Sequence, residues 1–220
     1  MNPIFPIPAI AGAALVTLMA CSQAPPMPQS GIPDTASSPT SATSTEAAKS
    51  WSDILGTASA PAGWQVYPCD NPLLLCVEAD GELVGTVEHL SYPLETVELQ
   101  TPVEASAEAE FAFLQAWVAE HYDAIERDRQ VGYANAIFAA DTPTEISVGD
   151  LPGLRYGYSL THANGTPIDE AIGYVTTDGE RLHVFVTGVI SQDPAGSISD
   201  PAALAEFKPH LDTIIQELLL

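Results

Sequence analysis

The sequence predicts an α+β domain in which helices pack on one antiparallel β-sheet. Residues 154–190 contain three β-prone runs joined by two short turns, as in a meander. Residues 104–130 and 200–218 instead repeat apolar side chains at helical spacing. Because strands precede the long helix and more strands follow it before the last helix, this order favours helices packed on an antiparallel sheet.

The N-terminus predicts export and a lipid anchor. Residues 7–20 form an apolar run that is too short to span a bilayer comfortably and is typical of a signal peptide. Ala20 directly before Cys21 resembles the lipobox of bacterial lipoproteins, which implies cleavage after residues 1–20 and acylation of Cys21. Met19 and the lack of a basic residue before the run depart from that pattern. An ordinary secretory signal or an uncleaved anchor therefore stays open as an alternative.

Residues 21–50 are expected to hold the lipidated cysteine and a disordered tether. Pro, Ser, Thr and Ala dominate this segment without hydrophobic periodicity, so it cannot bury enough apolar surface to offset the entropy of ordering. Residues 51–220 remain for a single domain, which is long enough to build a core. We expect a membrane-anchored lipoprotein on the periplasmic or lumenal side of a bacterial membrane.

The charge of the chain restricts its partners. The net charge is −23 because only 6 Lys plus Arg oppose 29 Asp plus Glu. No basic surface is available to displace counterions from phosphates, so nucleic acid is not an expected partner. Polybasic attachment to anionic lipid is equally disfavoured, which leaves the lipid anchor as the expected link to the membrane.

The first part of the domain is predicted to be β-structure. After a short stretch at residues 51–55, residues 65–67 form a brief strand, and residues 73–79 and 82–90 form a hairpin around Asp80-Gly81. A weak strand containing Val97 and Leu99 is expected next.

One long helix is predicted over residues 104–130, ending near Gly132. Its apolar face is expected to contain Phe111, Leu114, Val118, Tyr122 and Ile125, with Phe113 and Trp117 along one edge. Its opposite, solvent-facing side is expected to carry Glu120, Asp123 and Arg127.

Residues 136–140 and 145–148 are expected strands before the meander. In the last strand of the meander, His183 alternates with Val184, which predicts an exposed or second-layer position for the histidine. Asp200-Pro201 is a favourable helix start. Pro209 is expected to kink the final helix or restart it as a second one.

This arrangement resembles the PsbP-like superfamily over residues 62–220. The resemblance lies in residues 151–158, Asn164-Gly165, residues 173–175, residues 182–184 and the helix over 207–218. Members of the superfamily include extrinsic photosystem II subunits and related bacterial lipoproteins, so the resemblance implies a docking or assembly role. No functional residue is carried over, because no site motif of the family is matched.

Cys69 and Cys76 are predicted to form a disulfide. If Cys21 carries lipid, these are the two cysteines left in an exported chain, and turn residues lie between them. Either residues 73–75 fold inward as a lid, or Cys76 belongs to a strand paired with the one that ends at Cys69. Two buried reduced thiols are the alternative.

No catalytic motif, metal site or cofactor is expected, and the protein is not predicted to be an enzyme. His121, Asp123 and Glu126 are the densest group of possible metal ligands, but helical geometry points them apart. Asp169-Glu170 and Asp178 with Glu180 could offer oxygens to Ca²⁺, although turn formation explains Asp178. The tryptophans could line a groove, but packing is the more favoured role for them. The tryptophans are Trp51, Trp64 and Trp117.

Two functions follow from these features. The first is a lipid-anchored, non-catalytic accessory protein that docks on or helps assemble a membrane protein complex. The alternative is a lipoprotein that binds a small molecule or a metal, with possible hydrolytic activity, in a pocket between helix and sheet.

Overall fold

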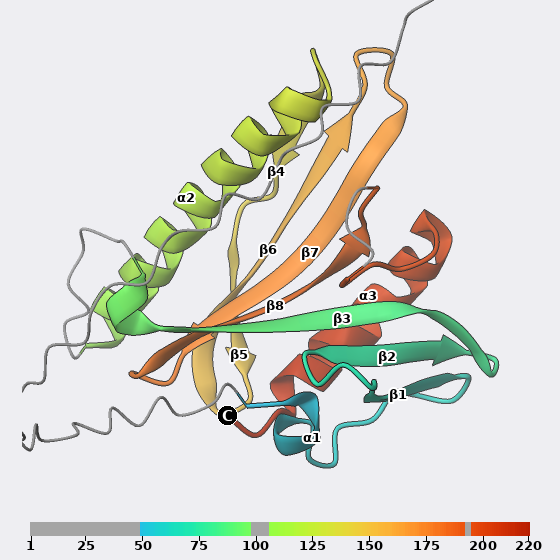
Figure 1. Cartoon of the computed structure of the whole chain (residues 1–220). Helices are drawn as coiled ribbons and strands as arrows, with labels where there is room; N and C mark the ends of the chain where they lie inside the picture. The colour runs from blue at the N-terminus through green and yellow to red at the C-terminus, as the bar shows by residue number, and fades with distance from the viewer. Residues whose placement is uncertain (1–48, 98–105, 192–194) are drawn as a thin grey trace, which may run out of the picture. The chain divides into compact units, whose positions relative to one another are not determined.

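The computed structural model describes residues 49–97, 106–191 and 195–220. Cys21, the predicted signal peptide, almost all of the predicted tether and Leu99 lie outside these residues. The described strands form one eight-stranded antiparallel sheet, and the α+β prediction is confirmed (Figure 1). The strands are β1 (Trp64–Pro68), β2 (Leu74–Ala79), β3 (Glu82–Pro93), β4 (Ile137–Ala140), β5 (Thr144–Val148), β6 (Leu151–Thr161), β7 (Pro167–Thr177) and β8 (Arg181–Val189).

The helices are α1 (Trp51–Ile54), α2 (Ala107–Gly132) and α3 (Pro201–Gln216), with one 3₁₀ turn, η1 (Leu94–Thr96). Along the sheet the strand order is β1-β2-β3-β8-β7-β6-β4, and β5 also pairs with β6. The predicted hairpin and meander are therefore joined by the pairing of β3 with β8. Of the weak strand expected next, Val97 directly follows η1 and is not in a strand, while the rest of that segment lies outside the described residues.

Helix α2 covers one face of the sheet. Its buried side chains Phe113, Leu114 and Val118 pack against β6, β7 and β8. Phe111, which was expected on this face, is only partly buried. The apolar face is thus rotated toward Phe113, which the sequence placed at its edge.

Helices α1 and α3 cover the other face. Their buried side chains form one core with β2, β3, β7 and β8, and Trp51 and Phe207 are each 0% exposed. The predicted cap of α3 is confirmed, because Asp200 accepts hydrogen bonds from the backbone N–H groups of Ala202 and Ala203. The helix continues through Pro209, so the restart as a second helix does not occur.

Buried and half-buried ion pairs fix both layers to the sheet. Arg129 at the end of α2 lies 2.8 Å from Asp169 of β7, whose carboxylate also accepts hydrogen bonds from the backbone N–H and the hydroxyl of Ser191. On the opposite face, Arg155 of β6 lies 3.2 Å from Asp212 of α3. These pairs hold the helices at fixed positions, and they use basic side chains that are scarce in this chain.

Candidate functional site

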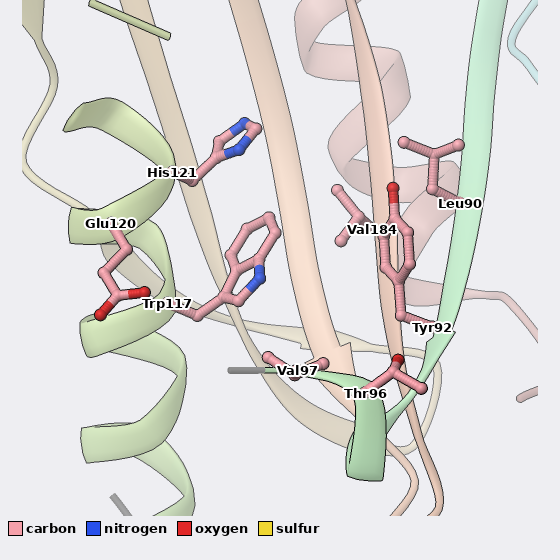
Figure 2. Close-up of a pocket in the computed structure, with 8 residues that line it drawn as sticks. All are labelled: Leu90, Tyr92, Thr96, Val97, Trp117, Glu120, His121 and Val184. Carbon is pink, nitrogen blue, oxygen red and sulfur yellow. The ribbon is translucent and has the colours of Figure 1, made fainter. Parts of the chain in front are cut away.

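A cleft of about 370 Å³ opens between α2 and the part of the sheet formed by β3 and β8 (Figure 2). The residues that line it are Leu90 and Tyr92 of β3, Val184 of β8, Thr96 and Val97 at η1, and Trp117, Glu120 and His121 of α2. In Figure 2 the indole and the imidazole extend from α2 toward the strands, whereas the Glu120 carboxylate points away from them. The walls are mainly apolar and aromatic, and few polar groups enter, as in most small-molecule sites.

Local structure brings these residues together. Trp117 and His121 are four residues apart on α2, so their side chains lie one above the other on the same helix face. Leu90 and Tyr92 are two residues apart on β3 and share one face of the sheet. The register places Leu90 opposite Val184 on β8. The cleft therefore depends on the pairing of two strands that lie far apart in the sequence.

The imidazole of His121 is held by aromatic rings. It stacks on Trp117 with 4.8 Å between ring centroids and an interplanar angle of 13°, and it meets the edge of Tyr156 at 5.5 Å. Burial lowers the pKa of His121 to about 4, so the ring is uncharged at neutral pH. Within the described residues no hydrogen bond occupies either ring nitrogen. One nitrogen is a donor and the other an acceptor.

The ring of Tyr156 meets the rings of Trp117 and His121 edge-on. It is 3% exposed, and its hydroxyl has no hydrogen-bond partner in the part of the chain that the structure describes. The ring crosses from β6 over Gly173 of β7, where a Cβ atom would lie 2.6 Å from the hydroxyl oxygen. Only a glycine leaves room for this ring. Burial raises the pKa of Tyr156, so the hydroxyl keeps its proton and is an unused donor.

The side chains proposed as metal ligands on α2 do not converge. His121 lines the cleft, whereas Asp123 and Glu126 line a polar groove of about 630 Å³ on the outer side of α2. Glu120 lies on the rim that the two hollows share. Within the described residues, no group of three or more His, Cys, Asp or Glu side chains is placed to hold a metal ion.

Asp169, Glu170 and Asp178 have structural partners, whereas Glu180 is exposed. Asp169 pairs with Arg129, and Glu170 with Lys208. One Asp178 oxygen accepts hydrogen bonds from the backbone N–H groups of residues 180 and 181, which is turn chemistry. Burial raises the pKa of this carboxyl, but those bonds and the contact with His183 outweigh it and hold the pKa below its ordinary value.

The prediction that His183 is exposed or in a second layer is wrong, because this side chain is 0% exposed in the core. Both faces of β8 are covered, so alternation along this strand does not distinguish core from solvent. His183 lies 3.1 Å from Asp178 through Nε2 and 3.2 Å from Nε2 of His89 through Nδ1. His89 stacks on Phe185 with ring centroids 4.6 Å apart. Burial lowers the pKa of His89 to about 3, so this imidazole is uncharged at neutral pH.

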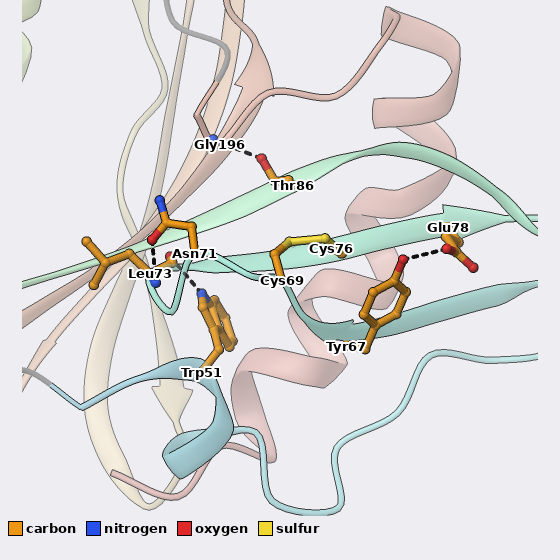
Figure 3. The surroundings of a disulfide bond; sticks show 9 residues. All are labelled: Trp51, Tyr67, Cys69, Asn71, Leu73, Cys76, Glu78, Thr86 and Gly196. Atoms are coloured by element: carbon orange, nitrogen blue, oxygen red, sulfur yellow. Dashed lines mark hydrogen bonds between the residues drawn. A yellow bond between two sulfur atoms is a disulfide. The ribbon is translucent and has the colours of Figure 1, made fainter.

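Cys69 and Cys76 are joined in a disulfide, with 5.3 Å between their Cα atoms (Figure 3). Cys76 belongs to β2 and lies opposite Tyr67 of β1, so the paired-strand alternative is the one observed. Leu75 points into the core, and no lid forms. The tryptophans have different surroundings: Trp51 is in the core, Trp64 packs on the ring of Phe207, and Trp117 lines the cleft.

Comparison with known proteins finds likenesses among solved structures. No family model matches the chain, and no curated protein matches it. The solution structure of cyanobacterial PsbP (CyanoP) from Synechocystis sp. PCC 6803 is similar at 11% sequence identity and a TM-score of 0.39. The match covers 73% of this chain and 83% of that chain. At this level of similarity the PsbP-like assignment stays a prediction.

The sequence suggested a pocket between helix and sheet only as an alternative, and it did not identify the residues that line the cleft. It placed Trp117 at the edge of a helix face and His121 among possible metal ligands, and no local signal linked either residue to Tyr92. The i, i+4 spacing of Trp117 and His121 was the one available hint, since it predicts a shared face.

Among the described residues, no helix is long and apolar enough to cross a membrane.

Proposed function

We propose that this chain is a lipid-anchored, non-catalytic accessory protein that docks on or helps assemble a membrane protein complex. Acylation of Cys21 and the tether that follows it would hold the domain at the periplasmic or lumenal side of a bacterial membrane. The observation that carries the docking proposal is the distribution of charge over the folded domain.

Basic side chains are scarce and are used within the domain. Arg129, Arg155 and Lys208 form ion pairs with acidic residues of the sheet or of α3. Arg181 donates a hydrogen bond from Nε to the hydroxyl of Ser91. The surplus of acidic residues therefore dominates the field of the domain, and a partner with a basic surface would be attracted to it.

The outer groove of α2 is the proposed contact surface. Glu120, Asp123 and Glu126 follow one another along it at spacings of three residues. Arg127 also lines this groove, but its Nε donates to the carbonyl of Asp123 on the same helix. A basic segment of a partner protein could contact the acidic side chains without disturbing the sheet.

Crosslinking in native membranes tests this proposal. Wild-type protein should capture a specific membrane partner, and the variant Glu120→Gln/Asp123→Asn/Glu126→Gln should capture much less of it. The yield should also fall as salt is raised, because exposed charges are screened. Recovery of no partner above background by the wild type would contradict docking.

A matched control removes three acidic charges elsewhere. Glu145, Glu206 and Glu217 are exposed and lie outside the α2 groove. The variant Glu145→Gln/Glu206→Gln/Glu217→Gln should capture the partner as the wild type does. An equal loss in both variants would show that net charge, rather than the α2 surface, governs the interaction.

The anchor is tested by Cys21→Ser. This variant should be released from membranes, with circular dichroism of the domain unchanged, since the tether separates the anchor from the domain. Mass spectrometry of the wild type should show acyl chains on Cys21. If salt alone washes the wild-type protein off membranes, lipidation is wrong.

Binding of a small molecule is a second candidate function, and the cleft favours it. A volume of about 370 Å³ is within the range of ligand pockets. The neutral His121 and the aromatic rings around it provide recognition groups, while the described residues that line the cleft include a single carboxylate, on the rim.

A further inference from the structure

The cleft between α2 and β3 has the composition of a binding site for an uncharged ring compound. Tyr92 and Leu90 form one wall and Trp117 with His121 the other (Figure 2). The lining contains no Lys or Arg in the described part of the chain, so nothing there would neutralise a bound anion. The Glu120 carboxylate lies on the rim and points away from the strands, so a buried cation would also lack a counterion inside.

One polar side chain that lines this apolar site, and a second one buried next to it, have unused hydrogen-bonding capacity. The neutral imidazole of His121 has one donor and one acceptor nitrogen. Both are available to a ligand, because ring contacts with Trp117 and Tyr156 rather than hydrogen bonds hold the imidazole in place. The hydroxyl of Tyr156 is buried next to the site and lacks a partner in the described part of the chain. Buried polar groups without partners are rare in folded proteins and cost free energy, so such a group calls for an explanation.

We propose that the cleft binds a compact, uncharged, ring-containing molecule that carries a hydrogen-bonding oxygen. The ring inserts between Trp117 and Tyr92, where aromatic and aliphatic side chains replace water on both of its faces. The oxygen bonds to the imidazole of His121, whose ring nitrogens have no hydrogen-bond partner among the described residues. This inference rests on the second candidate function and does not require the docking surface.

The proposed hydrogen bond to His121 distinguishes this site from a nonspecific apolar pocket. A nonspecific pocket would bind apolar rings according to their size, whereas the proposed site prefers a ring with a hydroxyl over an isosteric ring with a methyl group. One hydrogen bond in such a site corresponds to a preference of about 3- to 10-fold.

Equilibrium dialysis with 2-naphthol and 2-methylnaphthalene tests the inference. The protein used is the full mature chain carrying Cys21→Ser, which avoids partition of the probes into lipid. We expect saturable binding of both probes, with 2-naphthol tighter by about 3- to 10-fold. His121→Phe keeps an aromatic ring in place and should abolish this preference. Trp117→Ala should weaken both probes by about tenfold, as loss of an aromatic contact surface predicts.

The opposite face of the sheet provides a matched control. Trp64 and His210 form a second Trp–His pair, with ring centroids 5.9 Å apart, away from the cleft. His210→Phe should leave both affinities unchanged. Absence of saturable 2-naphthol binding would overturn the inference, as would a preference that survives in His121→Phe or affinities that Trp117→Ala leaves unchanged. None of these outcomes alters the crosslinking result, so the two proposals fail separately.

Discussion

The two faces of the sheet differ in how completely helices cover them. On one face, α1 and α3 bury Trp51, Phe207 and Leu211 completely. On the other face α2 is the only helix among the described residues, and it buries Val118 but leaves Trp117 partly exposed beside β3. Two covering helices yield a filled core, whereas one helix leaves part of the sheet accessible. A ligand can bind at the accessible side without disrupting the close packing that stabilises the fold.

Removal of one large side chain from each face should show the greatest contrast. Phe207→Ala should lower the free energy of unfolding by about 3–5 kcal/mol, because it leaves a cavity in the filled core. Trp117→Ala should lower it by about 1–2 kcal/mol, since this side chain is only partly buried and lines the cleft. Denaturant titrations of both variants measure the difference. Equal losses would mean that the α2 face is as closed as the other.

The disulfide strengthens the face covered by α1 and α3, because it links β1 to β2 at the edge of that core. Cys69→Ser/Cys76→Ser should lower the free energy of unfolding by about 2.5 kcal/mol on the chain-entropy account. Alkylation of the denatured, unreduced wild type checks the bridge itself. Labelling of both cysteines under those conditions would show two reduced thiols instead.

Much of this architecture was predictable because its signals are local. Asp80-Gly81 marks the β2–β3 turn, Asp200 caps α3, and the spacing of Cys69 and Cys76 suits a bridge between paired strands. Each of these features depends on residues close together in the chain. The pairing of β3 with β8 does not, since it joins His89 to Phe185 across the sequence.

The predictions that were wrong also depended on contacts between residues far apart in the sequence. His183 alternates with apolar residues as a half-exposed strand residue would. Its face of β8 is covered by α1 and α3, the first and last helices of the domain in the sequence. The predicted apolar face of α2 differs from the observed one because Phe111 and Phe113 are both apolar. Contact with the sheet decides which of them is buried. Predicting the cleft requires both the pairing of distant strands and the orientation of α2. The sequence therefore indicated His121 only as a possible metal ligand.

The pH dependence of stability should distinguish the cleft histidine from an ordinary surface histidine. Burial lowers the pKa of folded His121 to about 4, below the usual value near 6.5 in the unfolded chain. The unfolded state therefore binds more protons between these values, and stability falls as the pH drops from about 7 toward 4. The contribution of His121 between pH 7.5 and pH 5 is roughly 1–2 kcal/mol.

Comparison with His121→Phe isolates this contribution from the other titrating groups. The variant should lose roughly 1–2 kcal/mol less than the wild type when the pH is lowered from 7.5 to 5. Urea denaturation at both pH values measures the two losses. Identical losses would place the imidazole in water, outside the cleft.

The smallest effect is expected on the outer side of α2. Glu120→Ala should change the free energy of unfolding by under about 0.5 kcal/mol, because the side chain is exposed and makes no hydrogen bond or ion pair with the described residues. Thermal denaturation checks this change. A large destabilisation would mean that the rim of the cleft is part of the core.

Accessibility of the two tryptophans tests the difference between the faces most directly. Trp51→Phe/Trp64→Phe leaves Trp117 as the single emitter, and Trp64→Phe/Trp117→Phe leaves Trp51, with folding of each variant verified by circular dichroism. Acrylamide should quench the fluorescence of Trp117 strongly and that of Trp51, which is 0% exposed, weakly. 2-Naphthol should protect Trp117 from acrylamide and leave Trp51 unchanged. Equal quenching of the two indoles would contradict an open cleft on the α2 face and a closed core on the other.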